Sequence, residues 1–337
     1  MKKIGCLGGS FDPIHQGHIA VANYVLKECE LDEVWLIPSK ETPLKNRVLT
    51  SFEQRERMIR LALKDESGLA CCTIEKELPI PSYTIQTVTA LKSEYPECEF
   101  YWIIGDDLVE QLPKWKEIEK LLQEIQFVVV SRNEKNINLN SNLIYLNQLH
   151  IPISSTEIRD GNFQNLNPEV RDYIFQQGLY LESIIFNRCQ EYRAKHSVSV
   201  AKMALELADG KDLDKWRVYV AAILHDVCKD MSSQEQKKWI DEDVLRTIED
   251  KEYLWHSFAA KKWIKTNLML EDNEILNAIY HHTDGEDKSL LGVIIYLADK
   301  LERTRKVWSE SVIEKAKIDP VGMKDWVEKE IEEWRNT

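Results

Sequence analysis

The sequence lacks two features that would point to a membrane or to a nucleic acid. Its longest apolar run, Leu290–Ala298, is far below the ~18–20 residues that a membrane-spanning helix needs, so we expect no membrane association. Lys and Arg number 44 against 57 Asp and Glu, and a net charge of −13 argues against a nucleic-acid binder, which carries a basic face or tail. The first residues turn polar and glycine-rich too early for a signal peptide.

Cysteine is present in a pattern that excludes a disulfide framework. The seven cysteines are odd in number and form no CxxC pair, and several lie in apolar stretches, where Cys behaves as a small hydrophobic residue. We therefore expect free thiols and a reducing, cytoplasmic location.

At 337 residues the chain is long enough for two domains, and its pattern changes once. Up to about residue 182, short β-rich runs alternate with amphipathic segments, which predicts a Rossmann-like, doubly wound parallel sheet with helices on both faces. The β-rich runs cover residues 3–9, 33–39, 70–78, 100–107, 127–132 and 143–147, with helices expected over 52–63 and 115–125. Later spacing is helical, so we expect an α/β domain over 1–182 and an all-α domain over 183–337.

The string GGSFDPIHQGH lies between the first expected strand and a helix. Gly8 and Gly9 allow the backbone to approach a ligand closely, and His15 and His18 fall three residues apart at the helix start. A helix N-terminus favours phosphate, and imidazoles beside it can donate hydrogen bonds to phosphoryl oxygens during transfer. The pattern predicts a phosphate-transfer site at the carboxyl end of the first strand.

A second string, ISSTEIRDG, places Ser154, Ser155, Thr156 and Arg159 at another helix start. Hydroxyls at such a start are usually only a cap, but together with an Arg they also form a phosphate clamp. The two strings resemble those of the HxGH nucleotidyltransferases, which move a nucleoside monophosphate from a triphosphate to an acceptor. The resemblance implies an ATP site made of Gly8, Gly9, Ser10, Phe11, His15, His18, Asp107, Arg132, Ser154, Ser155, Thr156 and Arg159.

Three further strings, IPSKETPLK, PSYTIQT and IIGDDLVEQLPKW, are similar to those of bacterial nicotinate-nucleotide adenylyltransferases. This resemblance covers about residues 1–181 and implies an acceptor site made of Lys45, Ser82, Tyr83, Thr84 and Trp115. Tyr83 and Trp115 would supply aromatic surface for a pyridine ring, although Trp115 is equally a candidate core residue. The acceptor alternatives are nicotinamide mononucleotide and another phosphorylated alcohol.

The implied transfer needs no protein nucleophile, because the 5′-phosphate of nicotinate mononucleotide attacks the α-phosphorus of ATP in line. Catalysis then consists of positioning and charge neutralisation by His15, His18, Lys45 and Arg159. The sequence shows no dedicated carboxylate cage for Mg²⁺, so we expect this ion to arrive with ATP.

Five of the eight histidines follow residue 190, and their contexts are informative. Imidazole and carboxylate groups on apolar helical stripes must be paired or metal-bound, because isolated buried charge is costly. The ordered set is His196, His225 with Asp226, His256, His282 and Asp299. Mixed nitrogen and oxygen ligands suit a first-row transition metal in a hydrolytic site.

This ordered set resembles the HD phosphohydrolase superfamily over about residues 186–310, and its strings look like those of bacterial symmetrical bis(5′-nucleosyl)-tetraphosphatases. The resemblance implies that the metal ligands are His196, His225, Asp226 and Asp299, and that Lys229, His256, His282 and Arg305 hold phosphate or a second metal. The expected metal is iron, with manganese or cobalt as alternatives. The chain departs from the family at Asp284, where a hydroxyl residue is usual, and at Arg303, where a proline is usual.

The sequence therefore predicts a bifunctional enzyme. Its α/β domain would make nicotinate adenine dinucleotide from ATP and nicotinate mononucleotide, and its helical domain would cleave diadenosine tetraphosphate into two ADP. A non-catalytic, nucleotide- and metal-binding regulatory role for the helical domain is the alternative, and a homo-oligomer is left open.

Overall fold

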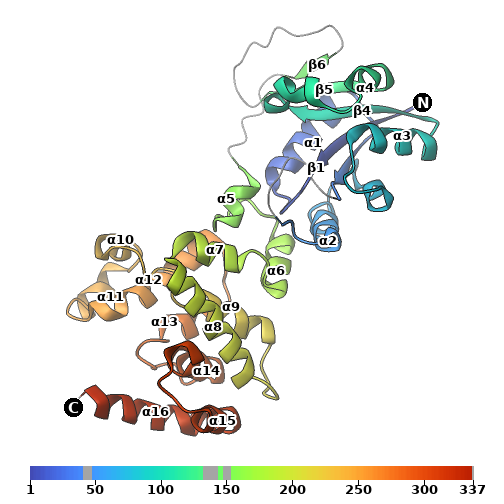
Figure 1. Ribbon diagram of the computed structural model, residues 1–337. Coiled ribbons are helices and arrows are strands. Elements are labelled where there is room, and N and C mark those ends of the chain that lie inside the picture. The colour runs from blue at the N-terminus through green and yellow to red at the C-terminus, as the bar shows by residue number, and fades with distance from the viewer. Residues whose placement is uncertain (41–47, 132–142, 147–152, 336–337) are drawn as a thin grey trace. The chain divides into compact units, whose positions relative to one another are not determined.

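The computed structural model of the chain describes residues 1–40, 48–131, 143–146 and 153–335. It forms two compact units (Figure 1). Unit 1 consists of residues 1–158 and 165–171, and unit 2 of residues 159–164 and 172–337.

Unit 1 is built on one parallel sheet, as predicted. Its strands are β1 (Lys2–Gly9), β2 (Glu33–Pro38), β3 (Leu69–Cys71), β4 (Cys98–Gly105), β5 (Gln126–Val130) and β6 (Leu143–Leu146), in the order β3-β2-β1-β4-β5-β6. The chain order reverses between β1 and β4, which is where open α/β sheets bind ligands at the carboxyl ends of their strands.

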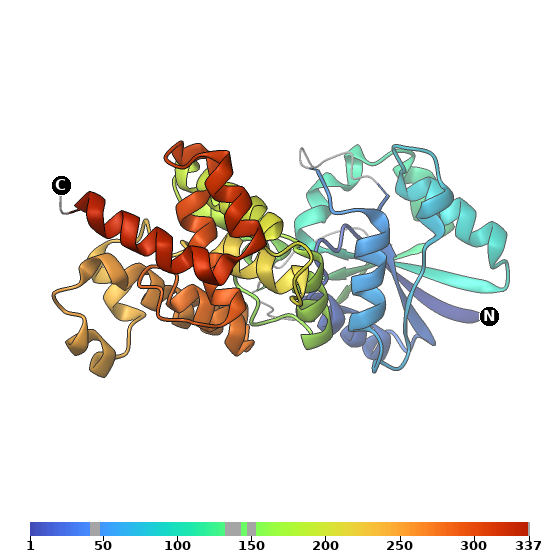
Figure 2. The same ribbon diagram turned by 90° about the horizontal axis from the view of Figure 1, so that it is seen from below.

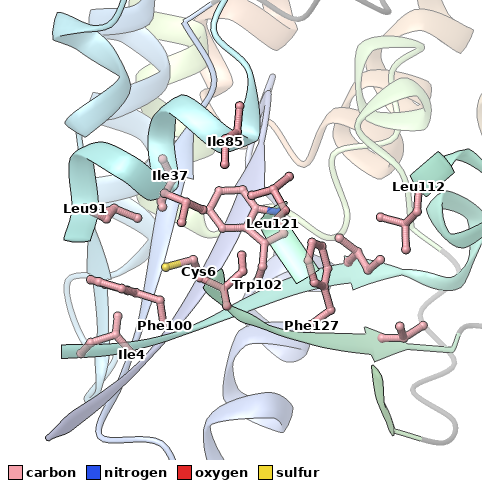
Figure 3. Packing of buried hydrophobic residues seen from close by; sticks show 14 of the residues in the cluster. Ile4, Cys6, Ile37, Ile85, Leu91, Phe100, Trp102, Leu112, Leu121 and Phe127 are labelled. Carbon is pink, nitrogen blue, oxygen red and sulfur yellow. The ribbon is translucent and has the colours of Figure 1, made fainter. Parts of the chain in front are cut away.

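Helices cover both faces of this sheet. Alternate residues of the strands, among them Cys6, Trp102 and Phe127, pack against apolar side chains of the covering helices on one face (Figure 3). The helical elements of unit 1 before the second phosphate string are α1 (Gln16–Glu28), α2 (Phe52–Ala62), η1 (Ile74–Glu77), α3 (Thr84–Glu94), η2 (Asp106–Lys114) and α4 (Ile118–Glu124). The buried positions of β4 and β5 hold β-branched or aromatic side chains, among them Trp102, Ile104 and Val129, as expected for strands that are covered on both faces.

Two expected elements are shorter than predicted. The strand expected over 70–78 ends at Cys71, because the Lys76 N–H donates to the Thr73 carbonyl (2.8 Å) and turns the chain into η1. The helix expected over 115–125 begins only at Ile118, because Glu117 before it has a left-handed backbone (φ 54°).

Every regular element within the described part of unit 2 is helical, as predicted (Figure 2, yellow-green to red). The elements are α7 (Leu181–Arg188), α8 (Glu191–Leu207), α9 (Lys215–Leu224), α10 (Ser233–Lys238), α11 (Glu242–Thr247), η3 (Glu252–Leu254), α12 (Trp255–Trp263), η4 (Ile264–Leu268), α13 (Asn273–Tyr280), α14 (Leu290–Leu301), η5 (Arg303–Arg305), α15 (Glu310–Ile318) and α16 (Pro320–Arg335). The short helices α5 (Ser155–Arg159) and α6 (Pro168–Gln177) carry residues of both units.

Helix α14 is the centre of unit 2. It is buried along nearly all of its length and packs against α8, α9, α13 and α16, as expected for a helix that is apolar on all sides. The predicted apolar faces are also inside: Val200, Met203 and Leu207 of α8 are buried. Because Asp299 lies on α14, the centre of the unit holds a carboxylate.

The units divide the chain before the boundary that we expected at 182. Residues 159–164 and 172–182 belong to unit 2, in which the Phe163 N–H donates to the Asn267 carbonyl (2.7 Å) and Leu181 is fully buried. Domain limits at 182 and 183 stay a prediction. Within the described residues, no helix is both long and apolar enough to cross a membrane.

Candidate active sites

The first predicted site begins at the end of β1. His15 is the N-cap of α1, and its Nδ1 accepts the Gly17 N–H (3.2 Å), while the Nδ1 of His18 accepts the His15 N–H (3.2 Å). The two rings lie with centroids 3.8 Å apart. Because both Nδ1 atoms accept, both neutral rings carry their proton on Nε2, which makes Nε2 of each ring a hydrogen-bond donor.

A small pocket lies beside these rings, at the carboxyl ends of the central strands. His15 and His18 line it together with Gly105, the last residue of β4, and Val130, the last residue of β5. Two imidazole donors and the N-terminus of α1 therefore face the position where parallel α/β sheets bind phosphate.

The second string comes close to the first although 142 residues separate the two contact residues. Ser155 donates its hydroxyl hydrogen to the Pro13 carbonyl (2.9 Å). Ser154 caps α5, since its Oγ accepts the Glu157 N–H (3.2 Å). Thr156 is exposed and half-buried Arg159 ends the helix. Within unit 1, Ser155 of the second string therefore contacts Pro13 of the first string.

The other predicted nucleotide-binding residues lie at the same strand ends. Phe11 is 1% exposed and contacts His18 edge-to-face at 5.0 Å, and the Ser10 carbonyl accepts from the buried guanidinium of Arg55 (2.8 Å). Gly8 and Gly9 end β1. Asp107 is exposed at the start of η2. Lys45 and Arg132, which we also predicted, lie outside the described residues.

One of the predicted acceptor residues, Ser82, contacts a buried carboxylate that the sequence reasoning missed. Glu75 is 7% exposed, and its two oxygens accept hydroxyl hydrogens from Ser82 and Thr87 (2.8 Å each). A third donor is the Lys40 N–H (3.2 Å). The Ser82 side chain is therefore engaged by Glu75 and holds the loop that precedes α3.

The two aromatic residues predicted for the acceptor site, Tyr83 and Trp115, pack against the same hydrophobic cluster. Tyr83 is the N-cap of α3, and Thr84 is its first residue. Trp115 follows η2 and packs edge-to-face against Phe127 of β5 (6.2 Å between centroids), so it is partly a core residue. The Lys116 ammonium lies 4.5 Å from the centre of the Tyr83 ring, which adds a positive charge beside the aromatic surface.

In unit 2, the six predicted histidine and aspartate residues come together from five helical segments. His196 lies on α8, Asp299 on α14 and His256 on α12, while the other three follow the last turns of α9 and α13. The side-chain ligand atoms form two groups, each within 4.8 Å: His196, His225 and Asp226, and Asp226, His256 and His282. Asp226 belongs to both groups.

Asp226 directs one oxygen to each group. Its Oδ2 lies 3.7 Å from the His225 Nε2, and its Oδ1 lies 3.3 Å from the His256 Nε2 and 3.5 Å from the His282 Nε2. Asp299 completes the first group, with its Oδ1 3.1 Å from the His196 Nε2. Atoms about 3 Å apart that both carry lone pairs are spaced as adjacent ligands of one metal ion.

Backbone carbonyls fix the orientation of two of these rings. The Nδ1–H of His225 donates to the Ala222 carbonyl (2.6 Å), and the Nδ1–H of His282 donates to the Ile279 carbonyl (2.7 Å). A carbonyl only accepts, so the lone pair of each ring is on Nε2 and faces the cluster. The buried Nε2 of His225 has no hydrogen-bond partner among the described residues.

The electrostatics of the cluster favour the metal-binding forms of its ligands. Complete burial lowers the pKa of His225 to about 3, and burial also lowers the pKa of His256 to about 4, so both rings are neutral near pH 7. Burial alone would raise the pKa of Asp299, but the neighbouring Lys300 ammonium and the other charges around it outweigh burial and hold that pKa well below its usual range. Neutral imidazoles and ionised carboxylates are the forms that bind metals.

Among the described residues, four cations contact the cluster. Lys229 lies 2.9 Å from the His256 Nε2 and Arg305 donates to the Asp299 Oδ1 (2.7 Å), and their role in holding phosphate stays a prediction. Two others were missed: Arg193 donates to the Asp226 Oδ2 (3.2 Å), and Lys300 to the Asp299 Oδ2 (2.6 Å). The spacing of three residues between Arg193 and His196 on one helix was the available signal.

The two departures from the family pattern leave the cluster intact. Asp284 is paired with His281 (3.1 Å), whereas the hydroxyl of Thr283 lies 3.2 Å from the His256 Nε2 and 3.1 Å from the His282 Nε2. Arg303 pairs with surface carboxylates. Neither departure places a new charge among the six ligands.

Known proteins are similar to both parts of the chain. Residues 6–161 match the cytidylyltransferase-like family and residues 193–304 match the HD domain family. A "Probable nicotinate-nucleotide adenylyltransferase/Ap4A hydrolase" of Mycoplasma genitalium is 30% identical over 92% of this chain and 91% of its own length. The nicotinate-nucleotide adenylyltransferase of Bacillus subtilis is 38% identical over 53% of this chain and 99% of its own.

Among solved structures, the nicotinic acid mononucleotide adenylyltransferase of Plasmodium falciparum complexed with NaAD is 25% identical, with a TM-score of 0.45 over 53% of this chain and 98% of that one. The sequence matches decide the family, because they extend over both units and over nearly the whole length of the two-domain relative. This chain belongs to the nicotinate-nucleotide adenylyltransferase family, in the two-domain form whose cytidylyltransferase-like domain is followed by an HD domain.

Proposed function

We propose that unit 1 transfers AMP from ATP to nicotinate mononucleotide, with release of pyrophosphate. The observation that carries this proposal is the pair of Nε2–H donors, on His15 and His18, beside a pocket at the carboxyl ends of β1 and β4. An oxygen of the acceptor phosphate forms a bond to the α-phosphorus of ATP while the bond from that phosphorus to the pyrophosphate oxygen breaks. Mg²⁺ would arrive with ATP and neutralise charge on the leaving pyrophosphate.

Lys116 favours nicotinate over nicotinamide as the acceptor base. Its ammonium group lies 4.5 Å from the Tyr83 ring, beside the surface proposed for the pyridine ring, so a carboxylate there meets a positive charge and an uncharged amide does not. Buried Glu75 supports this site, because it holds the loop through Ser82. A product assay with ATP and both acceptors tests the proposal, and a chain that forms neither dinucleotide would refute it.

We propose that unit 2 hydrolyses diadenosine tetraphosphate into two ADP. Asp226 shared between two ligand groups carries this proposal, together with the buried, unpartnered Nε2 of His225. The first group with Asp299 would hold one divalent transition metal, for which iron is our first expectation, and the second group would hold phosphate or another metal. Such a metal supplies Lewis acidity and lowers the pKa of water at the site.

The charges around the cluster suit a polyphosphate. Within the described residues, four carboxylates each lie within 4 Å of Arg193, Lys300 or Arg305: those of Asp226, Asp230, Asp299 and Glu302. A fourth cation, Lys229, contacts His256. The protein groups are thus nearly balanced, and bound divalent metal would leave positive charge for a polyanionic substrate. Lys229 and Arg305 would contact phosphate oxygens.

Hydrolysis then proceeds by attack of water on one of the two central phosphorus atoms. A new bond forms from the water oxygen to that phosphorus, and the bond from the same phosphorus to the oxygen that bridges to the other central phosphorus breaks. The bridging oxygen leaves with the other half, the water proton is released, and both halves are ADP. Product analysis with diadenosine tetraphosphate tests this reaction. Products of AMP and ATP would contradict the symmetric cut, and tight binding without turnover by the metal-loaded chain would indicate the regulatory alternative.

A further inference from the structure

Glu302 is a buried carboxylate at the edge of the metal cluster to which neither the sequence analysis nor the proposed chemistry gives a role. It follows α14 directly and is 2% exposed. Ser199 of α8 donates its hydroxyl hydrogen to Oε2 (2.7 Å), and the Thr304 N–H donates to the same oxygen (2.8 Å). The other oxygen lies 3.2 Å from the Nδ1 of His196. Burial of a carboxylate costs free energy unless hydrogen-bond donors surround it, as they surround Glu302.

The Nδ1 of His196 has a side-chain partner from another segment, whereas the Nδ1 atoms of His225 and His282 have backbone partners within their own segments. His225 and His282 lie at helix ends, so each reaches the carbonyl of the residue three positions earlier, Ala222 or Ile279. Carbonyls in the last turn of a helix lack intrahelical partners and can accept such a bond. His196 lies within α8, whose carbonyls there are already used by the helix. Its ring needs a partner from another segment.

We propose that Glu302 is a positioning residue for His196. The carboxylate accepts the Nδ1–H, so that the neutral, metal-binding form of the His196 ring has its lone pair on Nε2, and Nε2 faces the Oδ1 of Asp299 at 3.1 Å. A carboxylate partner also makes the imidazole a stronger metal ligand than a carbonyl partner does. This inference rests on the metal site proposed for unit 2, and it predicts that one metal position depends on Glu302 while the other does not.

The substitution Glu302→Gln separates positioning from packing. Glutamine has the same length, but its amide NH₂ group donates, so it cannot accept from Ser199, Thr304 and His196 together. If the amide donates to the Nδ1 of His196, the ring proton moves to Nε2 and the metal-facing lone pair is lost. Loss of such a partner weakens metal binding by about 10–100-fold.

The test titrates the metal-free full chain with Co²⁺ and follows its visible absorption, with circular dichroism and thermal unfolding as measures of the fold. In Glu302→Gln we expect the affinity for one Co²⁺ ion to fall about 10–100-fold. If the chain binds a second Co²⁺ ion, its affinity for that ion should not change. Glu310→Gln, which removes an exposed carboxylate of α15 paired with Arg303, is the matched control and should bind Co²⁺ as the wild type does. A purely structural role would lower the unfolding temperature without changing the Co²⁺ affinity of the folded chain.

The result that overturns the inference is equal Co²⁺ affinity in wild type and a folded Glu302→Gln variant. If that variant does not fold, Glu302→Asp takes its place. It keeps the charge but draws the carboxylate back by one methylene group, so the affinity for the same Co²⁺ ion should fall by a smaller factor, and unchanged affinity again overturns the inference. A wild-type chain that binds no Co²⁺ refutes the proposed metal site itself, which is a distinguishable result.

Discussion

His15 caps the helix on which His18 lies, and each ring uses its Nδ1 to accept a backbone N–H of that helix start. The helix cap and the orientation of the two Nε2–H donors are therefore one structural feature. Because the backbone fixes the tautomer, the donors are in place before any nucleotide binds, which is the pre-organisation that stabilises developing charge in a transition state.

His18→Ala should lower the rate of AMP transfer by about 10²–10³, the usual cost of removing one such donor, and leave the fold intact. Gln16→Ala, at an exposed position of the same helix start, is the control and should retain activity. Steady-state kinetics with circular dichroism check both variants. A His18→Ala enzyme with wild-type turnover would exclude the proposed role.

His15→Asn should separate capping from catalysis. Asparagine is a good N-cap, so thermal stability should change by no more than about 1 kcal/mol, whereas turnover should fall because the imidazole donor is gone. If turnover persists while stability drops, His15 serves only as a cap.

Acceptor preference follows from Lys116. The wild type should use nicotinate mononucleotide with a higher kcat/KM than nicotinamide mononucleotide, and Lys116→Gln should reduce that preference by about threefold to fivefold, because an exposed ion pair contributes up to about 1 kcal/mol. Competition assays with both acceptors measure the ratio. Equal use of both acceptors by the wild type would contradict the nicotinate assignment.

Glu75→Ala should damage the acceptor site more than the ATP site. The substitution leaves the hydroxyls of Ser82 and Thr87 without their acceptor, at a cost of about 1–3 kcal/mol, and loosens the loop before α3. We expect KM for nicotinate mononucleotide to rise more than KM for ATP. If both KM values change by the same factor, the substitution perturbs the fold of the whole unit and not the acceptor site in particular.

Stability of the metal-free chain should fall as the pH drops from about 6.5 toward 4. The folded-state pKa values of His225 (about 3) and His256 (about 4) are depressed by burial, so the unfolded chain binds protons in this window that the folded chain cannot. The raised pKa of His196, where hydrogen bonding to Asp299 outweighs burial, acts in the opposite direction.

Below about pH 6 His196 is protonated in both states, so near pH 5 the net difference for these three histidines is about two protons, or about 2.7 kcal/mol per pH unit. Urea unfolding followed by circular dichroism measures the slope. His256→Gln should reduce it by about one proton, and an unchanged slope in that variant would contradict the buried, neutral state of His256.

Local strings in the sequence were enough to predict the two-unit architecture and to place the histidines of both sites. GGSFDPIHQGH holds a strand end, a turn and a helix start within eleven residues, so its geometry is set locally. The site residues that the sequence did not reveal contact residues far from them along the chain. Glu302 contacts His196 over 106 positions, and Arg193 contacts Asp226 over 33.

Residue type alone also could not show which serine hydroxyls form hydrogen bonds within the protein. Ser82 donates to Glu75, Ser155 donates to Pro13 and Ser154 caps α5, and each of these bonds depends on how the loops pack. The strand expected over 70–78 is cut short at a related place, because residues 74–77 form η1, in which Glu75 accepts hydrogen bonds from Ser82 and Thr87.

The two proposed active sites share no residue. The most direct measurement takes wild type, His18→Ala and the double variant His225→Ala with Asp226→Ala, and determines metal content, AMP transfer to nicotinate mononucleotide and cleavage of diadenosine tetraphosphate on the same preparation of each. We predict that the double variant loses the metal and the cleavage but keeps AMP transfer, and that His18→Ala loses only AMP transfer. Cleavage that persists in a metal-free double variant, or loss of both activities in either variant with its fold intact, would contradict the account.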